Sequence, residues 1–92
     1  MKTRRRVETR FFRFVFNPDG SGRLGVSLSK KVLRHAVARN RVRRLLREGF
    51  RLNPRWFSNT DLHVIGLEPL GKVWREWTLK DVVWQLEKVR ES

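Results

Sequence analysis

The sequence predicts one small α+β domain, in which an antiparallel or mixed β-sheet is packed by a long basic helix and a C-terminal helix. Two observations carry this prediction. The chain has 92 residues, a length that supports one hydrophobic core, and four Trp and six Phe are available to fill it. The hydrophobic pattern then indicates strand, strand, helix, strand and helix in that order. We divide the chain into an N-terminal arm at residues 1–9 and a single α+β domain at residues 10–92.

The N-terminal part predicts a basic arm followed by two strands. Residues 2–6 are almost entirely basic, which suits a frayed terminus and an RNA-contacting arm equally well. Residues 10–16 alternate, with Phe12, Phe14 and Phe16 on one face of a strand. Turn-forming residues fill positions 17–22, and residues 24–28 alternate again. We therefore expect the two strands to pair as a hairpin.

The remainder predicts two helices around a buried strand. Residues 31–52 contain no Pro, so one long helix is expected to start between Val32 and Ala36 and to end before Asn53-Pro54. Residues 61–67 suit a buried strand, and residues 68–77 suit a loop. Thr78 has the position of an N-cap with an acid three residues later, and apolar residues at helical spacing follow it.

Charge and composition narrow the function. Residues 1–56 carry 17 Lys and Arg against three acids, a net charge of +14, whereas residues 57–92 carry a net charge of −1. The chain has no Cys and no apolar run of the roughly 20 residues that a transmembrane helix needs, so we expect a soluble, cytoplasmic protein. A polyanion, most simply a nucleic acid, is the expected partner of the basic half.

The long helix concentrates this charge on one face. At about 100° per residue, the apolar positions Ala38, Val42, Leu45, Leu46 and Gly49 share one side. No acid occurs from position 30 to 47, although an ordinary solvated helix face mixes signs. The opposite arc, its borders and the segment leading into it form the predicted RNA-binding surface, which consists of Lys30, Lys31, Arg34, Arg39, Asn40, Arg41, Arg43, Arg44, Arg47 and Arg51.

One string in this region is specific. The segment LGVSLSKK at residues 24–31, followed by AVARNRVRRLLRE at residues 36–48, resembles the signature of the protein subunit of bacterial ribonuclease P. The similarity extends over roughly residues 10–90. It implies an α+β fold with a left-handed βαβ crossover, where the usual default is right-handed. Family members usually carry a helix before the first strand, and residues 2–9 are too short and too charged to form it. Either this helix is absent from the protein or the start of the chain is truncated.

The resemblance also implies a function. The protein would be one copy in a complex with ribonuclease P RNA, which removes the 5′ leader of precursor tRNA by Mg²⁺-dependent hydrolysis. The RNA would carry the chemistry and bind most of the Mg²⁺, and the protein would have no catalytic residue, no metal site and no membrane partner. The open face of the sheet would bind the leader, and by the alternation we place Phe11, Arg13 and Val15 there.

Other functions have weaker support. A ribosomal or other structural RNA-binding protein fits the composition equally well, and only the Arg-Asn-Arg string separates the two. A DNA-binding helix usually needs a dimer or a helix-turn-helix partner, and a membrane-surface helix needs a bulky apolar face. His35 and His63 lack a third ligand at metal spacing, and Trp56, Trp74 and Trp77 are expected to pack. Trp84 lies opposite the apolar stripe of its helix, so either it covers another Trp or it is exposed at a contact.

Overall fold

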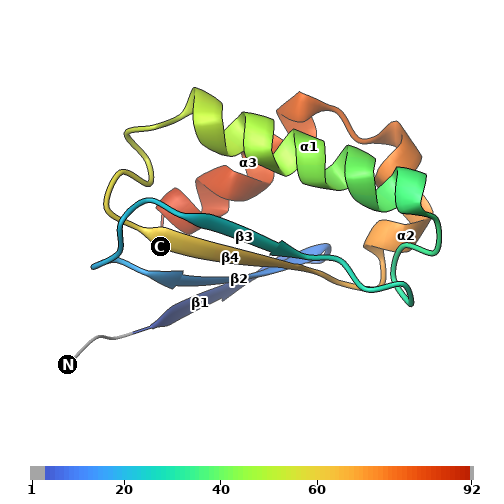
Figure 1. Cartoon of the computed structure of the whole chain (residues 1–92), viewed down its shortest axis with the longest axis horizontal. Helices are drawn as coiled ribbons and strands as arrows, with labels where there is room; N and C mark the ends of the chain where they lie inside the picture. Colours follow the sequence, from blue (N-terminus) through green and yellow to red (C-terminus); the bar gives the residue numbers. More distant parts are fainter. Residues whose placement is uncertain (1–3, 92) are drawn as a thin grey trace.

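The computed structural model of the chain describes residues 4–91 and confirms the α+β fold (Figure 1). One mixed sheet contains four strands in the order β1-β2-β4-β3, with β3 and β4 parallel and the other pairs antiparallel. The strands are β1 (Arg5–Glu8), β2 (Phe12–Asn17), β3 (Leu24–Ser27) and β4 (Asp61–Gly66). The helical elements are α1 (Ala36–Leu52), α2 (Leu70–Val73), the 3₁₀ helix η1 (Trp74–Glu76) and α3 (Leu79–Arg90).

The helices α1 and α3 lie side by side on one face of the sheet, and no described element covers the other face (Figure 1). The period-two alternation decides which side chains point to the helices. Phe12 and Phe14 of β2 and Val64 of β4 are fully buried between the two layers. Gly49 lets the helices approach closely, because a Cβ added there would lie 3.0 Å from Leu86 Cδ1. The core therefore lies between the sheet and the two long helices.

The predicted hairpin of residues 10–16 and 24–28 is wrong, because β4 lies between β2 and β3. The turn-rich segment crosses the end of β4 instead of joining two neighbours. The Asp61 carboxylate holds this connection, since its Oδ1 accepts the backbone N–H of Ser21 at 2.9 Å and that of Arg23 at 3.0 Å. Gly22 has a φ of 82°, which suits a turn that only glycine adopts easily.

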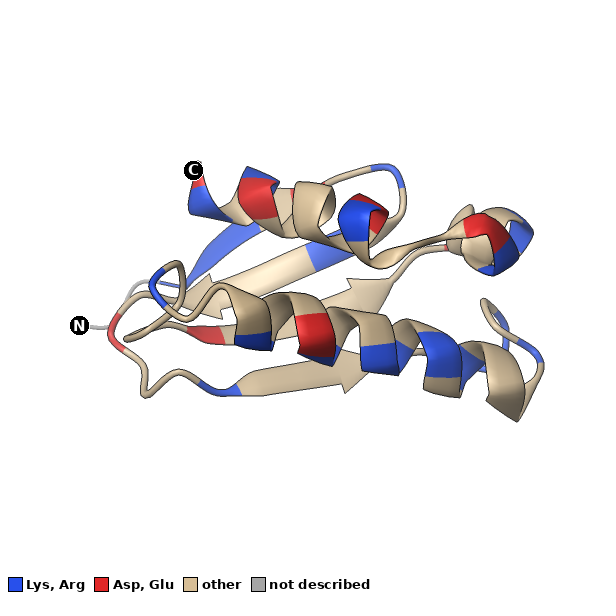
Figure 2. Cartoon of the chain, turned by 90° about the horizontal axis from the view of Figure 1, so that it is seen from above, with Lys and Arg blue, Asp and Glu red and all other residues tan. Residues whose placement is uncertain are grey.

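The crossover from β3 through α1 to β4 is left-handed. Figure 2 looks onto the helix side of the sheet, and both strands run in the same direction there. When the sheet is viewed from the helix side and turned so that both strands point upward, β4 lies to the left of β3, and α1 lies between the viewer and the sheet. The structure therefore has the hand that the family resemblance implied and not the usual right-handed one.

The ends of the two long helices follow the sequence signals, but two short helices were not predicted. The long helix begins at Ala36, inside the predicted window, and the Asn53 side chain donates to the Gly49 carbonyl at its end. Thr78 is the N-cap of α3, and its backbone N–H donates to Asp81 Oδ2 at 2.9 Å. The loop predicted over residues 68–77 is wrong, since this segment contains α2 and η1. Both are too short for a helical period to be visible in the sequence.

The N-terminal arm is also more ordered than we expected. Arg5–Glu8 form β1, which pairs with β2, and Val7 opposite Phe14 packs against the core. Positions 2 and 3 of the basic run lie outside the described residues. Within residues 4–91 no helix precedes β2.

Candidate RNA-binding surface

Helix α1 separates an apolar stripe from a basic face. Ala38, Val42, Leu46 and Gly49 are buried, as the helical wheel predicts, and Leu45 is partly buried. These residues face the sheet and α3, so the positions between them must face solvent. Figure 2 shows Lys and Arg recurring along the outer surface of α1. The predicted division of the helix into two faces is therefore confirmed.

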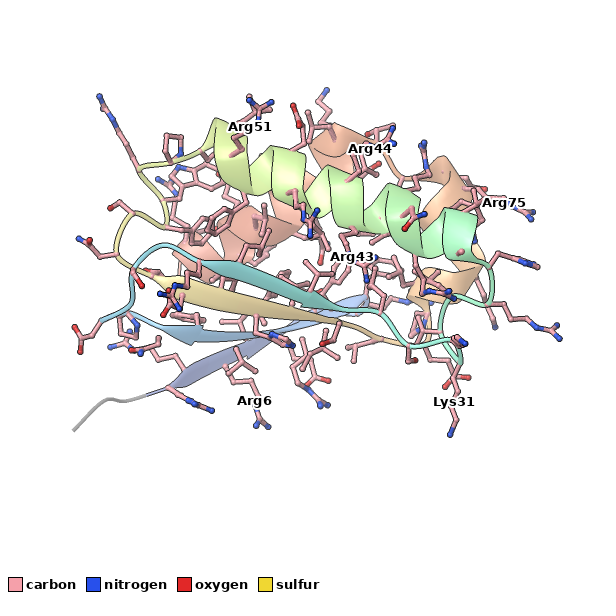
Figure 3. The ribbon with its side chains drawn as sticks, in the orientation of Figure 1. Arg6, Lys31, Arg43, Arg44, Arg51 and Arg75 are labelled. Atoms are coloured by element: carbon pink, nitrogen blue, oxygen red, sulfur yellow. The ribbon has the colours of Figure 1, made fainter. Side chains whose placement is uncertain are left out.

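Three arginines on this face have no hydrogen-bond or ion-pair partner among residues 4–91. Arg44 and Arg47 are exposed and Arg43 is half-buried, and none of them forms a hydrogen bond or ion pair with another described residue. Figure 3 shows Arg44 pointing away from the sheet and Arg43 on the flank of α1 above β3. Asn40 is exposed in the same arc. These guanidinium groups can meet an anion without breaking an existing contact.

Three other arginines of the predicted surface, Arg39, Arg41 and Arg51, are engaged within the protein. Arg39 Nη1 donates to the carbonyls of Leu33 at 2.9 Å and Arg34 at 3.1 Å, so it holds the loop before α1. Arg41 Nη2 donates to the Trp77 carbonyl at 2.8 Å and ties α1 to the start of α3. Both residues occupy the borders of the basic arc, where the wheel places them.

At the far end of the helix, Arg51 forms an ion pair with Glu48. This acid lies just beyond the acid-free run at residues 30–47. The outer surface of α1 is therefore less basic at its C-terminal end than along its first three turns.

The basic surface continues beyond the N-terminal end of α1. Lys30, Lys31 and Arg34 are exposed on the loop between β3 and the helix. Ser29 closes this loop, since its carbonyl accepts the backbone N–H of Leu33 at 3.0 Å. The structure thus brings the three predicted loop residues next to the helix face.

The uncovered face of the sheet contains two of the three residues that we placed there. Arg13 and Val15 alternate with the buried phenylalanines of β2 and point away from the helices. The placement of Phe11 on this face is wrong. Phe11 precedes β2, where the chain bends, and its ring packs edge-on against Trp77 at 5.1 Å on the helix side. The strand alternation does not extend to a residue outside the strand.

Sequence reasoning missed the polar residues that β3 and β4 add to this face. Ser27 Oγ and His63 Nε2 are hydrogen-bonded at 2.8 Å, and Gly25 leaves room for the imidazole. A hollow of about 660 Å³ beside them is flanked by Arg4 and Arg23. The alternation of residues 61–66 would have placed His63 there, had the parallel pairing with β3 been known.

No cluster of three His, Asp or Glu side chains occurs among residues 4–91, so the chain offers no built metal site in its described part. Asp61 accepts backbone N–H groups and Asp81 belongs to the capping box. Trp77 packs against two phenylalanines, as expected, whereas Trp84 is 56% exposed with the Lys88 ammonium 4.4 Å from its ring centroid. None of the helices in residues 4–91 has the length and apolar character needed to cross a membrane.

Comparison with known proteins identifies the family. A family model described as Ribonuclease P matches residues 1–90. The chain belongs to this family. Its fold agrees with that of the ribonuclease P protein from Thermotoga maritima, with a TM-score of 0.80 over 96% of this chain and 82% of the other at 23% identity. The protein from Staphylococcus aureus gives a TM-score of 0.73 at 28% identity, over 96% of this chain and 79% of the other.

Relatives named ribonuclease P protein component are similar over different lengths. The protein from Pseudomonas entomophila is 41% identical over 51 residues, which are 55% of this chain and 38% of the relative. The protein from Pseudoalteromonas translucida is 32% identical over 88 residues, which are 94% of this chain and 63% of the relative. The chain thus spans less than two thirds of the length of either relative.

Proposed function

We propose that this chain is the protein subunit of a ribonuclease P ribonucleoprotein, which it serves by binding RNA. In this proposal the catalytic RNA cleaves the 5′ leader from precursor tRNA in a Mg²⁺-dependent reaction. The described residues of the protein lack a carboxylate cluster that would suit Mg²⁺, so the proposal assigns the metal to the RNA. Residues of the predicted surface hold the catalytic RNA, and the uncovered face of the sheet receives the leader.

The observation that carries this proposal is the unpaired basic face of α1. Arg43, Arg44 and Arg47 stand on a face that lacks an acid from position 30 to 47. Like charges four residues apart cost a few tenths of a kcal/mol per pair in an isolated helix. A bound polyanion removes this repulsion, and each guanidinium can form two parallel hydrogen bonds with a phosphate. Family membership supports ribonuclease P RNA as this polyanion.

In this proposal the leader binds on the uncovered face of the sheet, on the other side of the molecule from α1. Arg13 and Val15 lie there together with His63, and the hollow beside Arg4 and Arg23 is open to solvent. The sheet separates this surface from the basic face of α1 (Figure 1). A protein with two such surfaces can hold the catalytic RNA on one side and a single strand on the other.

Reconstitution tests the proposal. The protein is added to a bacterial ribonuclease P RNA and a precursor tRNA, at a Mg²⁺ concentration where the RNA alone cleaves slowly. We expect the protein to accelerate formation of the mature 5′ end, and the protein without the RNA to leave the precursor intact. The variant Arg43→Ala/Arg47→Ala is the matched control and should stimulate less. Absence of stimulation, together with tight binding to ribosomal RNA, would favour a structural RNA-binding role instead.

A further inference from the structure

A cavity of about 300 Å³ lies where the N-terminal end of α1 meets α2 and η1. One wall comes from the loop before α1 and the other from the segment between β4 and α3, about 40 residues further along the chain. The side chains that line it include five basic or titratable ones, and no acid of the described residues lines it. The five are Lys31, Arg34, His35, Lys72 and Arg75.

The two walls are held in place without a ligand. A Cβ on Gly71 would lie 2.4 Å from the Val32 carbonyl oxygen, so only glycine lets α2 approach the loop this closely. The loop itself is tied to α1 by the two hydrogen bonds that Arg39 donates to its carbonyls. Lys72 and Arg75 are therefore brought to the loop cations by backbone packing, although their charges repel.

Among residues 4–91, no acid forms an ion pair with a side chain that lines the cavity. The ion pairs among residues 4–91 are Glu8 with Arg13 and Glu48 with Arg51, and neither lies at the cavity. Glu76, the acid of η1, lines a different hollow together with Trp84. The first turn of α1 contains no acid either. Several cations that share a solvent-filled space without a counter-charge favour a bound anion.

We propose that this cavity binds a backbone phosphate of the RNA partner, and that Lys72 and Arg75 are RNA-contacting residues. The inference rests on the proposed function, which supplies the RNA. The cavity shares Lys31 and Arg34 with the predicted surface, so a strand lying along α1 reaches it without leaving the protein. The guanidinium carbon of Arg75 lies 5.3 Å from the ring centroid of Trp74, a second residue that lines the cavity.

The charge distribution along the sequence does not predict this site. Lys72 and Arg75 belong to the half of the chain with a net charge of −1, which looks purely structural. The tertiary fold places both residues in the lining of a cavity that the loop before α1 also lines. The proposed binding surface thus includes residues from both the basic part of the chain, residues 1–56, and the remainder, residues 57–92.

The first test compares two double variants that remove the same charge. Lys72→Ala/Arg75→Ala removes the α2 and η1 cations, and Arg55→Ala/Lys80→Ala removes an exposed Arg and Lys that do not line the cavity. Affinity for a bacterial ribonuclease P RNA is measured between 50 and 300 mM salt. We expect the first variant to bind about 10-fold more weakly, with a log–log salt slope shallower by about 1 to 2. The second variant should stay within about twofold of the unmodified protein. Equal affinity and slope for the two variants would overturn the inference.

The second test uses inorganic phosphate and no RNA. Phosphate is titrated into the protein while backbone amide signals are followed by NMR, in the unmodified chain and in Lys72→Ala/Arg75→Ala. We expect the signals of residues 31–36 and 71–75 to shift in the unmodified protein and to stay in place in the variant. Shifts confined to the outer face of α1 would overturn the cavity as an anion site.

The two tests separate the possible failures. If phosphate shifts the cavity signals but the RNA affinity of the variant is unchanged, the cavity takes free anions, and its assignment to RNA is wrong. If the unmodified protein fails to stimulate ribonuclease P RNA while phosphate still binds in the cavity, the proposed function fails and the anion site stands. Cooperative thermal unfolding of each variant shows that the compared proteins are folded.

Discussion

Removing two arginines from the middle of the basic face gives a quantitative test of the electrostatic argument. Arg43 and Arg47 lie one turn apart on α1, about 6 Å along the helix axis. Neither side chain forms a hydrogen bond or ion pair with another residue of the described part, so Arg43→Ala/Arg47→Ala deletes charge without breaking one. The variant should therefore change RNA binding and leave the fold intact.

The magnitude follows from the number of free cations. Six basic side chains of the predicted surface have no hydrogen bond or ion pair within residues 4–91, namely Lys30, Lys31, Arg34, Arg43, Arg44 and Arg47. If each neutralises one phosphate of a duplex, the slope of log affinity against log salt is about −5, at about 0.9 per phosphate. The variant keeps four, so its slope should be about −3.6. Between 50 and 200 mM salt, the affinity of the unmodified protein should fall by about 10³ and that of the variant by about 10².

The assay is a filter-binding or fluorescence titration at several salt concentrations, combined with urea unfolding of both proteins. The free energy of unfolding should change by less than about 0.5 kcal/mol, since surface substitutions away from special features have small effects. The loss of like-charge repulsion along α1 acts in the stabilising direction. An unchanged slope, or loss of cooperative unfolding in the variant, would refute the assignment of these two residues to a free anion-binding face.

Three further predictions concern stability and use urea unfolding as the measurement. Asp61→Ala should lower the free energy of unfolding by about 1–3 kcal/mol, because two backbone donors of the β2–β3 connection lose their charged acceptor, whereas Asp19→Ala at the exposed turn should change it by less than about 0.5 kcal/mol. Gly71→Ala should cost about 1–3 kcal/mol, since the new Cβ would meet a loop carbonyl, and a neutral result would contradict the close approach of α2. Trp77→Ala should cost about 3–5 kcal/mol and Trp84→Ala under about 1 kcal/mol, because 7% of the first side chain is exposed and 56% of the second; the opposite order would show that the two roles are reversed.

The helices and strands were predictable where a hydrophobic repeat extended over several residues or where a capping signal was present. The alternation of Phe12 and Phe14, the basic helix ending before Asn53-Pro54, and the capping box at Thr78 all have their predicted structures. Strand pairing was not predictable in the same way. Two strands joined by turn residues form a hairpin only if no third strand inserts between them. Here β4, about 40 residues further along the chain, lies between β2 and β3.

In the candidate RNA-binding surface, too, some features were predictable from the sequence and others were not. The exposed arc of α1 follows from the 3.6-residue period alone, so Arg43, Arg44 and Arg47 could be named from the sequence. The engagement of Arg39 and Arg41 could not, because their acceptors are carbonyls of a loop and of a distant helix start. RNA contact by any of these residues remains a prediction for the binding experiments.

By itself, the sequence determined the class of the fold, the basic face of α1 and, through the Arg-Asn-Arg string, the family. These properties depend on residues that are close in the chain or on one helix, so their pattern is visible without coordinates. Only the tertiary structure decided the strand order, the loss of Phe11 from the uncovered face, and the cavity that Lys72 and Arg75 line together with the loop before α1. The physical reason is common to all three. Each depends on which distant segments share space, and the packing of the whole core, not the local period, settles that choice.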